Sequence, residues 1–309
     1  MNPIYHPRYW KLWLALTLLK LLTLLPFEFQ LSIGKKLGSL SQRLLVKRRE
    51  IARTNLKLCF PAYSEKEINQ LLTKHFYSLG MYLFESALGW WGSQKKIEAL
   101  TSISGLEHLD RALEKGKGVL LFSAHFTTLD LSGIMLSIQR PLHAVYRPNK
   151  NPVIDHIINH GRERLLLSTI PKDNIRQMIK KLRNGEIVWY AMDQNFNHKG
   201  MLFSDFFNIP AATNTATSRL AKMTGATEIP FFAHRKQDQT GYQLELLPPL
   251  EIDGNQIQQE TDQLNQLVEE AVRKAPEQYL WVHRRFKDRP DNLPSYYSLP
   301  KAGGEPGRG

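Results

Sequence analysis

The spacing of apolar positions divides the chain into three parts. Residues 10–25 (WKLWLALTLLKLLTLL) are apolar around the whole circumference of a helix, with Lys20 as an interruption, and Pro26 follows. From residue 31 to about residue 100 the apolar positions recur at helical spacing. Beyond that, short apolar runs alternate with amphipathic segments. The expected parts are an N-terminal membrane-associated helix at 1–30, a helical segment at 31–100, an α/β domain at 101–297 and a Gly-rich tail at 298–309.

The alternation in the third part predicts an α/β fold, with a mainly parallel or mixed sheet flanked by helices. We expect strands at 103–105, 118–123, 143–147, 186–191, 228–235 and 242–250. We expect helices at 106–114, 129–138, 152–166, 174–182, 213–224 and 260–274. In such a sheet the functional site lies beyond the carboxyl ends of the strands.

The apolar strand within residues 119–130 (VLLFSAHFTTLD) ends near His125, and Asp130 follows on the first turn of the next helix. A carboxylate there can accept the proton of one imidazole nitrogen and leave the other nitrogen as a general base. The pair is also compatible with a structural histidine and an acid that favours a helix N-terminus. Arg147 and Asp193 also fall at strand ends, and this convergence favours a catalytic role for His125.

Two features of the helical segment predict structure rather than chemistry. Ser64 and Glu67 match the capping box of a helix start. Glu85 lies in an apolar, aromatic stretch, where we expect it to pair with a nearby cation rather than to act as a functional carboxylate.

Charge and composition narrow the classes of partner. The formal net charge is +12, from 41 Lys and Arg against 29 Asp and Glu, which indicates an anionic partner such as a membrane surface, a phosphorylated substrate, an acidic carrier protein or nucleic acid. The single cysteine, Cys59, excludes an intrachain disulfide. No phosphate-binding glycine motif supports a nucleotide site. The nearest metal candidates are His143, His156 and His160, but the last two lack the glutamate of H-E-x-x-H, so we expect no metal.

The N-terminal apolar run is shorter than the roughly 20 residues that span a bilayer. Trp10 and Trp13 suit the membrane interface, so attachment to a membrane is favoured over a buried core helix, while spanning and lying in the interface both stay open. The cations that follow place the rest of the chain in the cytoplasm under the positive-inside rule, and they suit anionic head groups, although a solvated helix face is the alternative. They are Lys35, Lys36, Arg43, Lys47, Arg48, Arg49, Arg53 and Lys57.

Six motifs follow one another along the chain: AHFTTLD, VYRPNKNPVID, HGRERLL, GEIVWYAMDQNF, EIPFF and APEQYLWVHRRFKDRP. Together they resemble the late acyltransferases of lipid A biosynthesis, the lauroyl and myristoyl transferases within the lysophospholipid acyltransferase-like superfamily. The likeness extends from the N-terminal helix to about Tyr297. Many relatives carry Glu where this chain has Asp130, and either residue can serve as the orienting carboxylate.

This resemblance implies a glycerolipid acyltransferase-like fold and a specific reaction. A fatty acyl chain would pass from acyl carrier protein to a hydroxyl on a primary acyl chain of a phosphorylated lipid A precursor, with or without Kdo. The reaction would occur at the cytoplasmic face of the bacterial inner membrane. It would need no cofactor and no metal, and nucleic acid would not be a partner.

In this context the arginines become candidates for substrate binding, since guanidinium groups suit phosphate oxygens. Arg147, Arg162 and Arg164 are candidates for the acceptor phosphate or the oxyanion, with surface ion pairs as the alternative. Arg284 and Arg285 could serve the acceptor or the carrier protein, or could anchor the closing segment to the sheet. Asp193 is compatible with substrate binding or with fixing a loop.

Two other hypotheses stay open at this point. The same fold could acylate another phosphoglycolipid or a lysophospholipid, because a His–carboxylate pair serves any hydroxyl acceptor. A basic peripheral membrane protein without catalytic activity would explain the charge and the N-terminus, but it leaves the polar residues at the strand ends unexplained.

Overall fold

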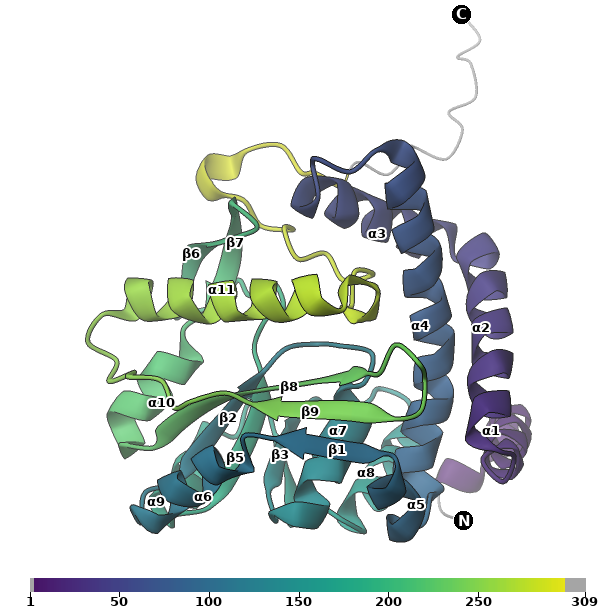
Figure 1. Cartoon of the computed structure of the whole chain (residues 1–309), viewed down its shortest axis with the longest axis horizontal. Helices are drawn as coiled ribbons and strands as arrows, with labels where there is room; N and C mark the ends of the chain where they lie inside the picture. The colour runs from purple at the N-terminus through teal and green to yellow at the C-terminus, as the bar shows by residue number, and fades with distance from the viewer. Residues whose placement is uncertain (1–2, 298–309) are drawn as a thin grey trace, which may run out of the picture.

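The α/β domain is built on a seven-stranded sheet (Figure 1). The computed structural model describes residues 3–297. The strand order is β1-β9-β8-β2-β5-β3-β4, and every pair is parallel except β8 with β9. The strands are β1 (Thr101–Ser104), β2 (Val119–Ser123), β3 (His143–Tyr146), β4 (Ser168–Pro171), β5 (Ile187–Ala191), β8 (Thr227–Arg235) and β9 (Tyr242–Leu246). The predicted α/β class with a mainly parallel sheet is therefore confirmed.

Helices cover both faces of this sheet, and the central strand β2 is therefore buried on both sides. Leu121 of β2 packs in one core with α6 and α7, while Phe122 packs in another with α11, and Leu120 packs with α9 and α10. The helices of the domain are α6 (Leu106–Glu114), α7 (Leu129–Gln139), α8 (Pro152–Glu163), α9 (Ile175–Arg183), α10 (Ala216–Thr224) and α11 (Ile257–Lys274).

Two elements differ from the expected pattern. Helix α8 ends at Glu163 rather than at the predicted residue 166, and the unpredicted short strand β4 follows it. A separate hairpin of β6 (Met201–Phe206) and β7 (Ile209–Asn214) precedes α10, which begins at Ala216 rather than at 213. Its two-residue turn, Phe207 and Asn208, has φ values of 55° and 58°. A two-residue turn with positive φ at both positions usually has the sequence Asn-Gly or Asp-Gly, so the sequence Phe-Asn does not predict this turn.

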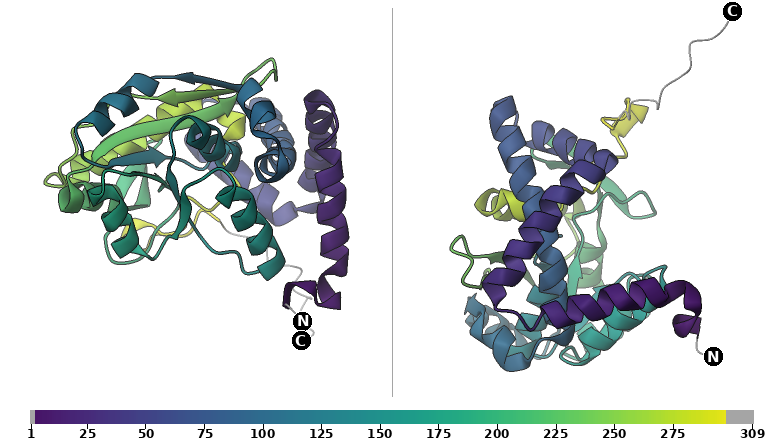
Figure 2. Two further views of the ribbon diagram at one scale, coloured as in Figure 1. Left: turned by 90° about the horizontal axis from the view of Figure 1, so that it is seen from below. Right: turned by 90° about the vertical axis from the view of Figure 1, so that its right-hand side faces the viewer.

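The helical segment forms a layer beside the sheet (Figures 1 and 2). It comprises α1 (Trp10–Leu22), α2 (Phe27–Leu44), α3 (Val46–Cys59), α4 (Glu65–Trp91) and α5 (Gln94–Ala99). Helix α4 lies between α2 and the sheet domain, and the predicted capping box of Ser64 and Glu67 is present at its start. The buried Glu85 of α4 accepts hydrogen bonds from Arg235 Nε of β8 (2.6 Å) and from the Tyr242 hydroxyl of β9 (2.7 Å). The expected cation partner is thus present, and it fastens the helical layer to the sheet.

Three glycines allow α2 and α4 to approach closely. A Cβ on Gly38 would lie 2.1 Å from the carbonyl oxygen of Phe76, and a Cβ on Gly80 would lie 2.0 Å from that of Gly34. Both contacts involve backbone atoms, which cannot rotate away as a side chain can.

The variant Gly38→Ala is therefore expected to push the two helices apart. Overpacking of this kind reduces the free energy of unfolding by about 1–3 kcal/mol. Gly89→Ala in the same helix α4 is the matched control, because its Cβ would meet only the end of the flexible Ile134 side chain, at 2.8 Å. Denaturant unfolding of both variants measures the difference. Equal stabilities would contradict this role of Gly38.

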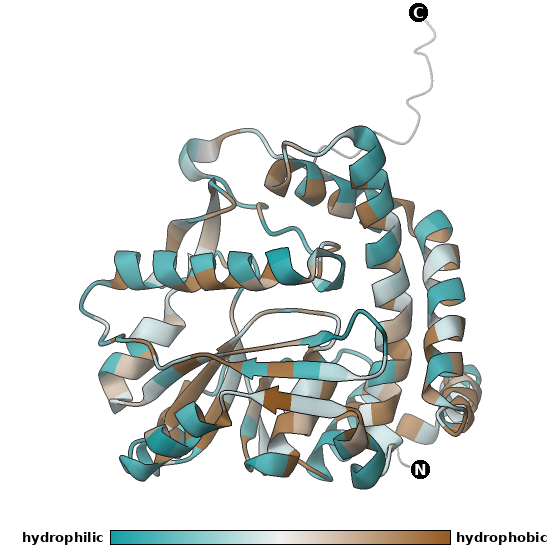
Figure 3. Ribbon diagram, in the orientation of Figure 1, coloured by the Kyte–Doolittle hydropathy of each residue, from teal (hydrophilic) through white to brown (hydrophobic). Residues whose placement is uncertain are grey.

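The N-terminal helices expose large apolar side chains. Figure 3 colours the ribbon of hydrophobic residues in brown, and such residues recur along these helices. Within residues 3–297 no helix has both the length and the apolar character needed to cross a membrane. Helix α1 is 13 residues long and buries only Leu19. The exposed side chains of α1 and α2 include Trp10, Leu14, Leu18, Leu21, Phe29, Leu37, Leu40 and Leu44.

Candidate active site

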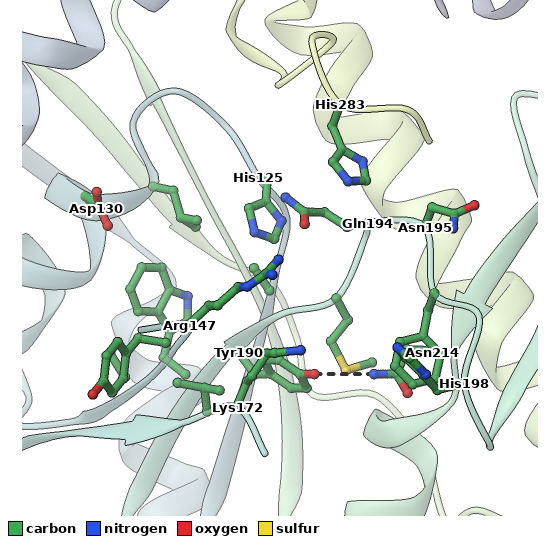
Figure 4. Close-up of a pocket in the computed structure, with 18 of the residues that line it drawn as sticks. His125, Asp130, Arg147, Lys172, Tyr190, Gln194, Asn195, His198, Asn214 and His283 are labelled. Atoms are coloured by element: carbon green, nitrogen blue, oxygen red, sulfur yellow. Dashed lines mark hydrogen bonds between the residues drawn. The ribbon is translucent and has the colours of Figure 1, made fainter. Parts of the chain in front are cut away.

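A cavity of about 360 Å³ lies at the carboxyl ends of the central strands (Figure 4). His125 follows β2 and Arg147 follows β3, and both side chains line this cavity. Helix α8 contributes Arg162, and the segment 275–290, here called the closing segment, contributes His283. The position agrees with the expectation that polar residues gather beyond the strand ends.

The register of the sheet places His125 beside Asp193. In the parallel pair of β2 and β5, Ser123 lies opposite Ala191, so the positions two residues further along each strand direction meet. His125 Nδ1 lies 2.6 Å from Asp193 Oδ1, and the backbone N–H of His125 donates to the same oxygen at 3.0 Å. Asp193 is 3% exposed. Because Nδ1 faces a carboxylate, it carries the proton, and Nε2 is left for chemistry in the cavity.

Charge strengthens this pair. Burial by itself would lower the pKa of His125, but the charge and hydrogen bond of Asp193 outweigh burial, so the pKa lies above its ordinary value. Burial would conversely raise the pKa of Asp193, yet His125 and the Tyr279 hydroxyl hold it well below its ordinary value. Asp193 is therefore a carboxylate throughout the neutral range.

Asp130 does not occupy the position that the sequence predicted. Its carboxylate accepts a hydrogen bond from the Tyr82 hydroxyl of α4 at 2.8 Å and forms an ion pair with Arg162 of α8. Asp130 lies on the first turn of α7, and both of these partners come from neighbouring helices rather than from His125. The carboxylate that binds the imidazole of His125 is Asp193, not Asp130. Asp130 still acts on His125 through its charge, which raises the pKa of the imidazole.

The predicted arginines fall into two groups. Arg147 and Arg162 line the cavity, and Arg147 is exposed at it, whereas Arg162 is engaged by Asp130. Arg164 instead donates to the carbonyl oxygens of Trp90 (2.7 Å) and Gly92 (3.1 Å), at the end of α4.

The two arginines of the closing segment lie outside the cavity lining. Arg285 is 2% exposed and donates to the carbonyl oxygen of Ala212 at 2.9 Å and to the Thr213 hydroxyl at 2.8 Å, both on β7. The guanidinium of Arg284 lies 5.8 Å from the ring centre of Tyr297. These contacts match the alternative that the closing segment is anchored by its arginines.

The closing segment also holds the loop of His125. The backbone N–H of Leu280 donates to the carbonyl oxygen of His125 at 2.9 Å, and that of Thr127 donates to Gln278 at 2.7 Å. Asn195 and Asp288 exchange hydrogen bonds of 2.6 and 3.0 Å, which join the loop after β5 to the same segment. The closing segment, which contains the motif APEQYLWVHRRFKDRP, thus fixes the geometry of the site.

Several residues of the cavity were not singled out from the sequence. His283 lies in its wall, and burial lowers the pKa of His283 to about 4, so this imidazole is neutral at neutral pH. His283 lies in the motif APEQYLWVHRRFKDRP, in which the sequence alone points to the adjacent arginines as candidates. The other polar lining residues include Lys172, Tyr190, Gln194, Asn195, His198 and Asn214, which are labelled in Figure 4.

The three histidines that the sequence offers as metal candidates make other contacts. His143 contacts Ser168 and Glu186, and the rings of His156 and His160 stack on each other at 6.0 Å. Within residues 3–297 no three His, Cys, Asp or Glu side chains are placed to hold a metal ion.

Comparison with known proteins assigns the chain to a family. The model of the bacterial lipid A biosynthesis acyltransferases matches residues 2–288. The lipid A biosynthesis lauroyltransferase of Escherichia coli K12 is 40% identical over 95% of this chain and 97% of its own length. The palmitoleoyltransferase of the same organism is 36% identical over 94% and 96%, and the myristoyltransferase is 29% identical over 92% and 89%. The chain therefore belongs to the bacterial lipid A biosynthesis acyltransferase family, and it is an O-acyltransferase.

Proposed function

We propose that this enzyme transfers a fatty acyl chain from acyl carrier protein to a hydroxyl of a phosphorylated lipid A precursor. The observation that carries the proposal is the His125–Asp193 pair at the cavity, since it is a general base poised for a hydroxyl. The relatives named as lauroyl-, palmitoleoyl- and myristoyltransferases of lipid A biosynthesis support both the reaction and the acceptor.

In the proposed mechanism, Nε2 of His125 takes the proton of the acceptor hydroxyl while its oxygen attacks the thioester carbonyl carbon. Asp193 holds the imidazole orientation and stabilises the imidazolium that forms. When the tetrahedral intermediate collapses, the carbon–sulfur bond breaks and the imidazolium returns the proton to the departing thiolate. A thioester is already activated, so no covalent enzyme intermediate is needed.

A general base supplies a factor of roughly 10²–10⁴ in rate. The rest comes from holding two substrates together and from stabilising the oxyanion. His283 is neutral and lies in the cavity wall, so its ring N–H can donate to an oxyanion or to the acceptor. It is a further candidate for binding the reacting groups in the proposed mechanism.

Arg147 is the cation we assign to the acceptor phosphate or the oxyanion, because it is exposed at the cavity, whereas Arg162 is paired with Asp130. Hydrogen bonds to charged groups contribute about 1.5–3 kcal/mol. Arg147→Ala is therefore expected to raise the KM for the phosphorylated acceptor about 10-fold or more, and Arg147→Lys to restore part of the loss.

Steady-state kinetics with varied acceptor measure this effect. Arg176→Ala is the matched control, because Arg176 is an exposed arginine of α9 that does not line the cavity. An unchanged acceptor KM in Arg147→Ala, together with normal kcat, would remove Arg147 from the binding site.

We further propose that the N-terminal layer attaches the enzyme to the cytoplasmic face of an anionic inner membrane. The exposed leucines of α1 and α2 supply the apolar contact. The cations of α2 and α3 supply about 1 kcal/mol each near an anionic surface. Two of them, Arg53 and Lys57, are paired with Glu65, so the exposed Lys47 and Arg48 and their neighbours on α2 carry this role.

The reaction itself is tested with purified enzyme in detergent. The donors are acyl carrier proteins loaded with lauroyl or myristoyl chains, and the acceptor is a tetra-acylated, phosphorylated glucosamine disaccharide with and without Kdo. Mass spectrometry is expected to show a product heavier by one acyl chain. No product from folded enzyme with any of these pairs would overturn the proposal, and transfer to a lysophospholipid alone would favour the other acceptor class.

A further inference from the structure

A second, mostly apolar cavity is lined in part by the closing segment, which also contributes to the lining of the active-site cavity. We call it the α2/α4 groove, and its volume is about 550 Å³. Its walls come from helix α2, the start of helix α3, helix α4 and residues 280–283. The lining residues are Leu37, Ser41, Leu45, Arg48, Phe76, Leu79, Gly80, Leu83, Leu280, Val282 and His283.

The groove and the active-site cavity share one wall. His283 lines both of them. Leu280 of the groove donates its backbone N–H to the carbonyl oxygen of His125 at 2.9 Å. The groove thus adjoins the residue that carries the proposed base, because Leu280 is hydrogen-bonded to His125 and His283 belongs to both linings.

The outer rim of the groove belongs to the apolar face of the helical layer. Leu37 is 41% exposed, Leu45 50% and Leu83 39%, and Leu40 and Leu44 continue the exposed face along α2. Arg48 at the rim is exposed, with one N–H directed to the carbonyl oxygen of Val282 at 3.1 Å. The groove is therefore apolar along its length and cationic at one edge, which suits an acyl chain attached to an anionic head group.

The proposed reaction requires two apolar sites, because both substrates carry acyl chains. The donor arrives on a water-soluble carrier protein, so its chain comes from the aqueous side rather than from the membrane. The acceptor is a membrane lipid whose reacting hydroxyl lies on one of its own chains, so that chain must leave the membrane and pass His125. The groove leads from the exposed leucine face toward His125, so it fits the acceptor chain.

Resting on the function proposed above, we propose that the α2/α4 groove binds the hydroxyl-bearing acyl chain of the lipid acceptor. The chain enters from the membrane over the exposed rim formed by Leu37, Leu45 and Leu83, and its hydroxyl reaches His125 beside His283. The donor chain occupies a different site.

Filling the rim of the groove tests this assignment. Leu37→Trp and Leu83→Trp add bulk at partly exposed positions, where the fold tolerates it, and Leu40→Trp on the same exposed face of α2 is the matched control. Each methylene withdrawn from an apolar site costs about 0.8 kcal/mol. Loss of the contacts of two or three methylene groups is expected to lower kcat/KM for the acceptor about 10-fold or more. The KM for the acyl carrier protein donor is expected to stay unchanged. Equal kinetics of Leu37→Trp and Leu40→Trp, or a change confined to the donor KM, would overturn the proposal.

A photo-crosslinking experiment locates the chain without depending on turnover. The probe is a phosphorylated glucosamine lipid with a diazirine at the end of its 3-hydroxyacyl chain, bound to wild-type enzyme. Adducts are expected on peptides that contain Leu37, Leu83 or residues 280–283. Adducts that avoid all three peptides, or labelling of these peptides by a diazirine on the donor chain instead, would overturn the assignment. If the transfer assay fails but the lipid probe labels the groove, the proposed function falls while the lipid site stands.

Discussion

The variant His125→Ala is expected to lose acyl transfer by a factor of about 10²–10⁴, which is the contribution of a positioned general base. The reason is geometric. His125 lines the active-site cavity with one ring nitrogen bound to Asp193, and no other imidazole within residues 3–297 combines a place in this cavity with a buried carboxylate partner. His283 cannot replace it, because its pKa is lowered to about 4 and it lacks such a partner.

Initial rates of product formation, followed by mass spectrometry with saturating substrates, measure this loss. His156→Ala is the control, since His156 is an exposed histidine of α8 outside the cavity lining. Thermal unfolding must show that His125→Ala remains folded, as its partly exposed position predicts. A folded His125→Ala enzyme with a rate within a few-fold of wild type would remove His125 from catalysis.

The second large effect is expected for Asp193→Asn. This change is nearly isosteric, so the loop should keep its shape, but the amide no longer stabilises the imidazolium and can favour the other tautomer. Transfer is expected to fall by at least about 10²-fold, toward the full contribution of the base. Rates at one fixed pH, with the acceptor saturating, measure it.

Asp130→Asn provides the discriminating comparison. Asp130 is bound to Tyr82 and Arg162, so its replacement leaves Arg162 without its counter-ion and is expected to act mainly on stability. Breaking a buried ion pair costs about 3–5 kcal/mol, and this pair is less than fully buried, so we expect a smaller loss. A rate that falls further in Asp130→Asn than in Asp193→Asn, at equal folded fraction, would reverse the assigned roles of the two carboxylates.

The origin of these two roles shows what sequence can predict. The strand that ends near His125 is a local signal, because its apolar run is continuous and buried on both faces. The sequence pairs Asp130 with His125 because the two residues are close along the chain. The true partner, Asp193, is 68 residues away and comes into place only through the parallel pairing of β2 with β5. Single-sequence patterns predict that strands exist, but they do not fix which strands are neighbours.

The same limit applies to the arginines and the hairpin. Arg164 and Arg285 have the chemistry of phosphate ligands, and their actual partners are backbone carbonyl groups and a hydroxyl that tertiary packing brings to them. The turn at Phe207 and Asn208 lacks the usual glycine. Phe207 is held there by its packing against Phe60 and Trp281 and by a hydrogen bond from its N–H to Glu269 at 2.6 Å. Tertiary contacts here outweigh the local turn preference.

The pH dependence of kcat/KM, in wild type and in Asp193→Asn, tests the central claim most directly. His125 must be neutral to act as a base, so activity rises as pH increases through its pKa, which Asp193 holds above the ordinary value of 6.5. The pKa values of Asp130 and Asp193 are lowered and that of His283 is about 4, so these groups titrate below this range. The account predicts that the rise lies above pH 6.5 in wild type and moves to lower pH in Asp193→Asn, where the charge and hydrogen bond of Asp193 no longer oppose the effect of burial. A rise at the same pH in both enzymes would contradict it.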